Sequence, residues 1–199
     1  MTTSREITYQ YGDNLKGKML VASPLMKDET FKRTVIYICE HNERGAMGLV
    51  LNRQLKSVTC GDILEQLKEK RPASALIADM PVFMGGPMDA HRGFVLHSSE
   101  YTSKHTIGIS DAVALTSSVD ILELIAEGKG PHSNMIVLGY AGWKPGQLEE
   151  EIGEYSWLVS SPPEAQMLFS DKEEDKWRAA SQYLGISPEF FLEPVAAPC

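Results

Sequence analysis

The sequence predicts a single α+β domain built on a largely antiparallel or mixed sheet. Its 199 residues suffice for one substantial core, and 43% of them are hydrophobic against 23% charged, as in an ordinary globular protein. Predicted strands outnumber predicted helices, and short connections that contain glycine join many of the strands in place of crossover helices. No linker marks a domain boundary, so the domain is expected over residues 14–187, between a flexible segment at 1–13 and a loosely ordered tail at 188–199.

The predicted strands are short runs of apolar, β-branched and aromatic residues between turn signals. In chain order they cover residues 17–22, 34–39, 46–52, 81–87, 92–97, 105–110, 112–115, 134–140 and 156–160. The first ends before Pro24, which cannot donate to a sheet ladder, and Gly45 lets the second and third join as a hairpin. A loop that contains Asp89, Ala90 and His91 is expected between the fourth and the fifth.

Helices are predicted where capping signals precede an apolar stripe. They cover residues 59–70, 119–127 and 171–184, and a further short helix starts within 144–155. Thr59 with Asp62, and Ser117 with Asp120, stand at about the spacing of a capping box, and Gly128 ends the second helix. The inner face of the last helix is expected to carry Trp177, Ala180 and Leu184.

Charge and composition exclude several classes of partner. The formal net charge of −8 repels a nucleic-acid backbone, and no helix-turn-helix is recognisable, so direct DNA binding is not expected. No apolar run approaches the ~20 residues that span a bilayer, and the amino end is polar, which predicts a cytoplasmic protein without a membrane partner. Cys39, Cys60 and Cys199 lack C-x-x-C spacing and fit a reducing compartment.

The sequence predicts neither a metal centre nor a cofactor. No histidine stands in an H-E-x-x-H pattern, and Asp89 with His91 would supply only two ligands from one loop. The nearest candidate for a nucleophile and its base is Cys39 with His41. A cysteine inside an apolar strand is more often an inert core residue, so a catalytic cysteine is not expected.

Two glycine-containing segments are candidates for anion binding. Residues 139–151 join a buried strand to a helix start through three glycines, a turn that can aim backbone N–H groups at an anion. The alternative is that the acidic residues 149–151 satisfy the helix start themselves. Residues 85–87 followed by Arg92-Gly93 place flexible backbone beside a cation, either as a pocket for a carboxylate or phosphate or as a plain surface loop.

Four segments together resemble the YqgE/AlgH family of bacterial proteins. In this order they are residues 20–41, 45–53, 83–97 and 139–152, and the resemblance extends from about residue 14 to about residue 185. It implies a compact α+β fold in which a branched, mixed or antiparallel sheet closes into a pseudo-barrel with peripheral helices. The family name carries the label of a transcriptional regulator, linked to exopolysaccharide genes.

The motifs and the resemblance give one set of candidate ligand-binding residues. They are Arg33, His41, Asn52, Gly85, Gly86, Arg92, His97, Gly142, Trp143 and Gln147. The first hypothesis is a cytoplasmic regulatory or binding module that acts on transcription at most indirectly, through a protein partner or a small anionic ligand. The alternative is an enzyme or small-molecule sensor with a pocket near Arg92 and Gln147, and with His41 or His97 as acid or base.

Overall fold

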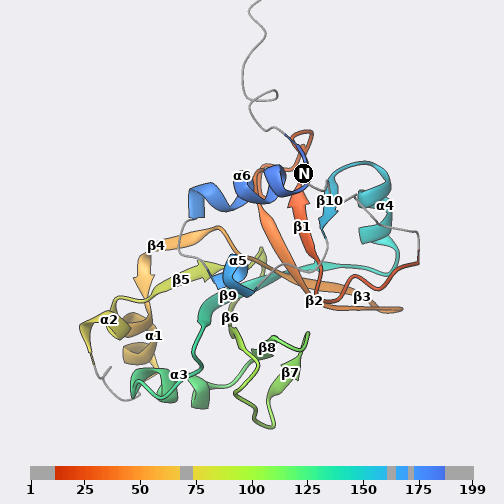
Figure 1. Cartoon of the computed structure of the whole chain (residues 1–199). Coiled ribbons are helices and arrows are strands. Elements are labelled where there is room, and N and C mark those ends of the chain that lie inside the picture. The colour runs from red at the N-terminus through yellow and green to blue at the C-terminus, as the bar shows by residue number, and fades with distance from the viewer. Residues whose placement is uncertain (1–11, 68–73, 161–164, 170–172, 187–199) are drawn as a thin grey trace, which may run out of the picture.

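Ten strands and six helices form the described parts of the chain, which are residues 12–67, 74–160, 165–169 and 173–186 of the computed structural model (Figure 1). The strands are β1 (Met19–Ala22), β2 (Val35–Asn42), β3 (Gly45–Val50), β4 (Gln54–Thr59), β5 (Pro81–Met84), β6 (Met88–Ser98), β7 (Thr106–Gly108), β8 (Val113–Thr116), β9 (Asn134–Trp143) and β10 (Trp157–Ser160). The helices are α1 (Cys60–Gln66), α2 (Ala75–Ala78), α3 (Val119–Ala126), α4 (Gln147–Gly153), α5 (Ala165–Phe169) and α6 (Glu173–Tyr183). Most of the expected N-terminal segment and the whole expected tail lie outside these residues.

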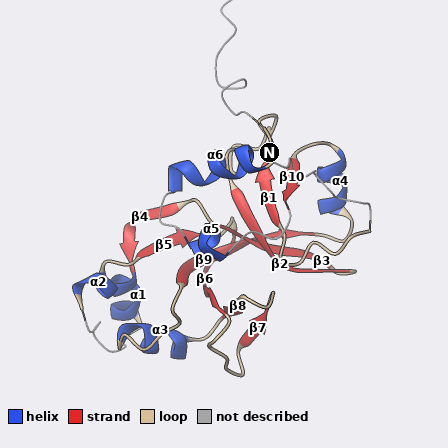
Figure 2. Cartoon of the chain, viewed as in Figure 1, coloured by secondary structure: helices blue, strands red, loops and turns tan. Residues whose placement is uncertain are grey.

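One curled, branched sheet runs through the molecule (Figure 2). Its main path is β10-β1-β2-β3-β9-β6-β8-β7, and β5 branches off beside β9 and carries β4. The last part of β9 pairs with β3, whereas its first part pairs with β6 on one side and with β5, in parallel, on the other. The predicted α+β class and the branched, mixed sheet are confirmed.

Every strand and helix expected from the sequence is present, with shifted ends. The hairpin between β2 and β3 pairs Asn42 with Gly45, whose φ of 122° is one that glycine adopts readily. The capping box of α1 is complete, because Thr59 and Asp62 each bond the backbone N–H of the other. Trp177 and Ala180 are buried on the inner face of α6, as predicted.

The prediction of a loop at Asp89, Ala90 and His91 is wrong. The structure continues β6 through these residues as a bulge. The pairing of β6 with β9 shifts register between Met88 and Gly93, and Asp89 has a φ of 52°. A bulge leaves a strand locally unpaired without ending it, which explains why a polar, glycine-flanked stretch has the sequence of a loop.

Three elements were not predicted: β4, α2 and α5. Among the described strands, β4 pairs with β5 alone, and its residues are exposed or half-buried, so it lacks the apolar run that marks a strand. Helices α2 and α5 have four and five residues, too few to show a helical period.

Helices α1 and α3 pack together on the part of the sheet where it branches. Their buried side chains share one apolar cluster with Val82, Val95 and Ile136 of three neighbouring strands. Those side chains are Cys60 and Leu64 from α1 and Ile121, Leu122, Ile125 and Ala126 from α3. In Figure 1, α1, α2 and α3 gather at one end of the molecule and α4 lies at the opposite end.

Glu100 ties the loop after β6 to the loop before β9. Its Oε1 accepts the backbone N–H of His132 at 2.6 Å and the Ser98 hydroxyl at 2.8 Å. The His132 N–H above all stabilises the charged form, so the pKa of Glu100 falls from 4.5 to about 2.

This pKa predicts a pH-dependent contribution to stability. A carboxyl group whose folded pKa is depressed stabilises the protein above its unfolded pKa, and the contribution is lost as the pH falls through the folded pKa. The Glu100→Gln variant retains the acceptor oxygen but not the charge. We expect the wild type to be more stable than Glu100→Gln at neutral pH, with the difference shrinking from pH 4.5 towards pH 2. Urea unfolding across this range measures it, and a difference that does not depend on pH would contradict the assignment.

Candidate functional site

A cleft lies between α1, α3 and the middle of β6, and we name it the α1–α3 cleft. Its volume of about 410 Å³ falls within the ~300–1,000 Å³ of ordinary ligand pockets. Its apolar walls are Ile63, Leu67, Phe94, Val95, Val119, Leu122, Ile136 and Leu138. Its polar groups come from Gln66, His91, Arg92, Thr116, Ser117 and Ser118, and no acidic side chain is among the described residues that line it.

The mouth of the cleft exposes apolar side chains. Leu67 is 42% exposed and Val119 is 37% exposed, although both stand next to a well-packed core. Large apolar side chains that gather around a cavity mark a binding surface, because a bound ligand removes them from water.

Arg92 is the one cation that sequence analysis singled out at this cleft. It stands two residues before Phe94 on β6, at the end of the bulge. The guanidinium carbon is 5.1 Å from the centre of the Phe94 ring, a distance at which the ring holds the cation. Arg92 lines the cleft, and no acidic side chain is among the described residues that line it.

Helix α3 begins at the same cleft with an unsatisfied N-terminus. The N-cap is Ser118, not the predicted Ser117, and its side chain makes no capping hydrogen bond. The Ser118 hydroxyl oxygen is buried and has no partner in the described part of the chain. The N–H groups of a helix start and the helix dipole favour negative charge, of which Asp120 in the first turn of α3 already supplies one.

His97 lies behind the cleft wall and is fully buried. Its Nδ1–H donates to the Ser98 carbonyl at 2.9 Å, so its Nε2 accepts from the hydroxyl of Thr116 at 2.8 Å. Thr116 in turn lies 2.7 Å from the Thr106 hydroxyl. Burial lowers the pKa of His97, and the neutral ring fits a chain in which both nitrogens already have partners. This histidine therefore positions Thr116, which lines the cleft, and both of its nitrogens are occupied.

Comparison with known proteins shows the family of this chain. Residues 19–189 match the AlgH-like protein family. The chain belongs to this family. A UPF0301 protein of Paracoccus denitrificans is 47% identical over 186 residues, covering 92% of this chain and 96% of its own, and one of Nitrobacter hamburgensis is 46% identical over 180 residues, covering 87% and 83%.

Two solved structures share the fold. The AlgH protein from Pseudomonas aeruginosa, known from a solution structure, has a TM-score of 0.76 at 37% identity, with 96% of this chain and 100% of that chain covered. Protein DIP2367 from Corynebacterium diphtheriae has a TM-score of 0.70 at 21% identity, over 94% and 95% of the two chains, and this likeness concerns the fold alone. The match to the AlgH-like family confirms the resemblance inferred from the four sequence segments.

The remaining candidate residues of this AlgH-like chain lie apart from the cleft. Gly85 and Gly86 pack against the backbone of β9, where there is no room for a side chain. Arg33 and Asn52 line a separate cavity beside α6. His41 contacts α4: its Nδ1 accepts the Leu15 N–H at 3.1 Å, and its Nε2 lies 2.8 Å from the Glu149 carboxylate.

Trp143 and Gln147 belong to a cluster around Glu151. The Trp143 and Gln147 side chains both donate to the Glu151 carboxylate, and Gln147 also accepts the backbone N–H of Lys144 at 3.0 Å. Gly142 lies beside them on β9, where an added Cβ would come within 2.7 Å of the Met88 sulfur. These contacts favour a structural role for residues 139–151 over the binding of an anion.

A pocket shared by Arg92 and Gln147 is not formed by the described residues. Arg92 lines the α1–α3 cleft at one end of the molecule, whereas Gln147 begins α4 at the other (Figure 1). The reason is the length of β9: Gly93 pairs with Leu138, and Gln147 comes only after the strand has run on to Trp143. That part of the sensor hypothesis is corrected, and the cleft at Arg92 stands without Gln147.

Other chemistries find little support in the described residues. Burial raises the pKa of the Cys39 thiol to about 12 and that of Cys60 to about 11, so both are protonated at neutral pH and are poor nucleophiles. No three His, Cys, Asp or Glu side chains gather as a metal site requires in the described segments. None of the helices within those segments is long and apolar enough to cross a membrane.

Proposed function

We propose that this protein is a cytoplasmic binding module whose ligand is a small carboxylate with an apolar body, held in the α1–α3 cleft. The observation that carries the proposal is the combination of apolar walls with Arg92, whose guanidinium meets no acidic group among the residues lining the cleft. Arginine binds a carboxylate through two parallel hydrogen bonds. The uncapped start of α3, at Ser118, is a second source of donors.

The charge and shape of the cleft favour a ligand with one negative charge. A single guanidinium and a helix start balance about one charge, and the helix dipole contributes roughly half a charge. Each methylene that enters the cleft contributes about 0.8 kcal/mol. We therefore expect affinity to rise along a series of straight-chain carboxylates until the apolar walls are covered.

The module acts on transcription at most indirectly, through a protein partner. A bound ligand covers Leu67 and Val119, which are exposed at the mouth of the cleft, and so changes the surface that α1 and α3 present. The net charge of −8 disfavours direct contact with DNA. In this account the ligand controls which protein binds the helical end of the molecule, and the site holds its ligand without converting it.

Isothermal titration with butanoate, hexanoate and octanoate tests the proposal. The wild type should bind octanoate best, and Arg92→Gln should weaken that binding by about 10- to 100-fold, the usual cost of losing a charge-assisted hydrogen bond. Lys104→Gln is the matched control, because Lys104 is exposed and lies outside the cleft. Octanol, which lacks the charge, should bind equally weakly to the wild type and to Arg92→Gln.

Three results would contradict the proposal: no binding by the wild type, equal octanoate affinity in Arg92→Gln, or the same loss in Lys104→Gln. Conversion of the bound carboxylate into a product would also contradict it, because a binding module returns its ligand unchanged.

A further inference from the structure

A second cavity, which we name the basic cavity, lies between the loop before β2, the start of β4 and α6. It has a volume of about 520 Å³, and its described lining residues are Arg33, Asn52, Arg53, Gln54, Lys56, Trp177 and Arg178. Four of these seven are cations and none is acidic, in a chain whose net charge is −8. It shares no lining residue with the α1–α3 cleft.

We infer that the basic cavity binds a small molecule that carries a diphosphate or an equivalent pair of phosphate charges. Arg33, Arg53 and Lys56 gather positive charge in one cavity, and an anion with several charges offsets their mutual repulsion. Arginine forks match phosphate oxygens geometrically, and phosphate accepts several donors at once. This inference is independent of the carboxylate proposed for the cleft.

Arg33 is fixed in place by its backbone. Its φ of 54° lies in the left-handed region, which non-glycine residues adopt only when their surroundings hold them there. The Asn52 side chain provides that restraint: its Nδ2 donates to the Arg33 carbonyl at 2.8 Å, and its Oδ1 accepts the Val35 N–H at 2.8 Å. Asn52 therefore joins the end of β3 to the loop and restrains the Arg33 backbone beside the cavity.

One nitrogen of the Arg53 guanidinium is hydrogen-bonded, and another has no partner among the described residues. Its Nη2 donates to the Lys32 carbonyl at 2.6 Å, whereas its buried Nε has no partner in the described part of the chain. Nearly all buried polar groups in proteins are hydrogen-bonded, so an orphan guanidinium N–H needs an explanation. Arg53 lines the basic cavity, so the guanidinium with this incomplete set of partners stands beside the space proposed for the ligand.

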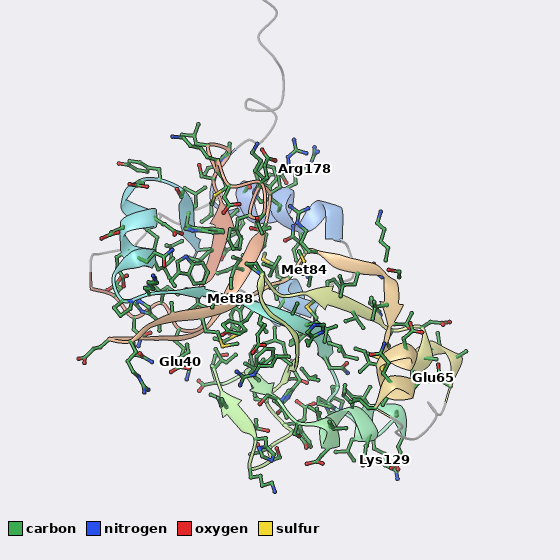
Figure 3. The ribbon with its side chains drawn as sticks, turned by 180° about the vertical axis from the view of Figure 1, so that it is seen from behind. Glu40, Glu65, Met84, Met88, Lys129 and Arg178 are labelled. Carbon is green, nitrogen blue, oxygen red and sulfur yellow. The ribbon has the colours of Figure 1, made fainter. Side chains whose placement is uncertain are left out.

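The other walls of the basic cavity come from β4 and α6. Gln54 and Lys56 are exposed and stand two apart on the strand β4. On α6, the buried Trp177 donates to the Ala22 carbonyl at 2.8 Å, and the next residue, Arg178, projects from the helix (Figure 3). The Trp177 hydrogen bond fixes α6 against β1 beside the basic cavity.

The experiment is a calorimetric titration of the full chain with inorganic pyrophosphate at low salt. The wild type should bind with one-site stoichiometry, and Lys56→Ala and Arg33→Gly should each weaken binding by about ten-fold or more, as for loss of a hydrogen bond to a charged group. Glycine is chosen at position 33 because it tolerates a φ of 54°. ADP and a sugar bisphosphate, titrated alongside, distinguish a nucleotide from a sugar phosphate as the source of the diphosphate chemistry.

Lys129→Ala is the matched control, because it removes one positive charge from the opposite end of the molecule to Arg178 (Figure 3). Equal weakening by Lys129→Ala would show a general charge effect and overturn the inference, as would the absence of pyrophosphate binding. Displacement of pyrophosphate by a short DNA duplex would also overturn it in favour of a nucleic-acid surface. The thermal midpoint of each unliganded variant checks the fold, and Lys56→Ala, on an exposed edge strand, carries the test if Arg33→Gly does not fold.

Discussion

Replacing Gly86 with alanine is expected to lower the free energy of unfolding by about 3–5 kcal/mol, the sum of backbone strain and overpacking. Gly86 has a φ of 153°, and an added Cβ would lie 2.2 Å from the Tyr140 carbonyl carbon and 2.4 Å from the Ala141 nitrogen. Both neighbours are backbone atoms of β9, so no side chain can rotate away. Relief requires β9 or the start of β6 to move.

Urea denaturation of Gly86→Ala measures this effect, and Gly108→Ala is the matched control. Gly108 also lies in the sheet, but it has no positive φ, and an added Cβ meets no atom within 4 Å. We expect the control to change stability by less than ~0.5 kcal/mol, as at ordinary surface positions. Similar losses of stability in the two variants would contradict the close approach of the Gly86 backbone to β9. The close approach matters for the site, since Gly86 leads into the strand that carries Arg92.

Replacing Glu151 with alanine is expected to cost about 2–5 kcal/mol, because each buried donor left unpaired costs about 1–3 kcal/mol. Glu151 Oε2 accepts both the Trp143 and the Trp157 indole N–H groups, at 2.9 and 2.7 Å. Both tryptophans are buried, and their rings meet edge to face with centres 6.0 Å apart. The carboxylate therefore joins α4 to β9 and β10.

Glu151→Gln separates the hydrogen bonds from the charge, because glutamine keeps one acceptor oxygen. It should lose less stability than Glu151→Ala, and Glu150→Ala, at an exposed neighbouring position, should change stability little. Thermal unfolding monitored by tryptophan fluorescence measures the stability of all three variants. Equal destabilisation by Glu150→Ala and Glu151→Ala would show that the indole hydrogen bonds contribute nothing specific.

The elements that sequence analysis found are those with a local signal. Thr59 and Asp62 satisfy each other within one turn, and β9 carries a continuous apolar run, so neither depends on distant residues to be recognised. Strand β4 was missed because a polar edge strand takes its structure from its partner, β5. The bulge at Asp89 has the sequence of a loop and is a strand only because β9 lies beside it.

The residues that line the α1–α3 cleft come from several separate segments of the chain. Arg92 was singled out as a cation beside glycine and lines the α1–α3 cleft, but the apolar walls of this cleft come from segments near residues 63, 95, 119 and 137 of the chain. Their juxtaposition depends on how the sheet branches, which no local pattern encodes. Ser118 was missed for a related reason: the capping signal at Ser117 is one residue away, and only the structure shows that the true N-cap is unsatisfied.

The most direct test of the carboxylate proposal is an NMR titration of the labelled protein with octanoate. We expect saturable shifts at the backbone amides of Val119 and Asp120, in the first turn of α3, and at the Arg92 side-chain Nε–H, with the basic cavity around Lys56 unaffected. Shifts scattered over the surface, or confined to the basic cavity, would contradict the claim that the α1–α3 cleft binds an apolar carboxylate.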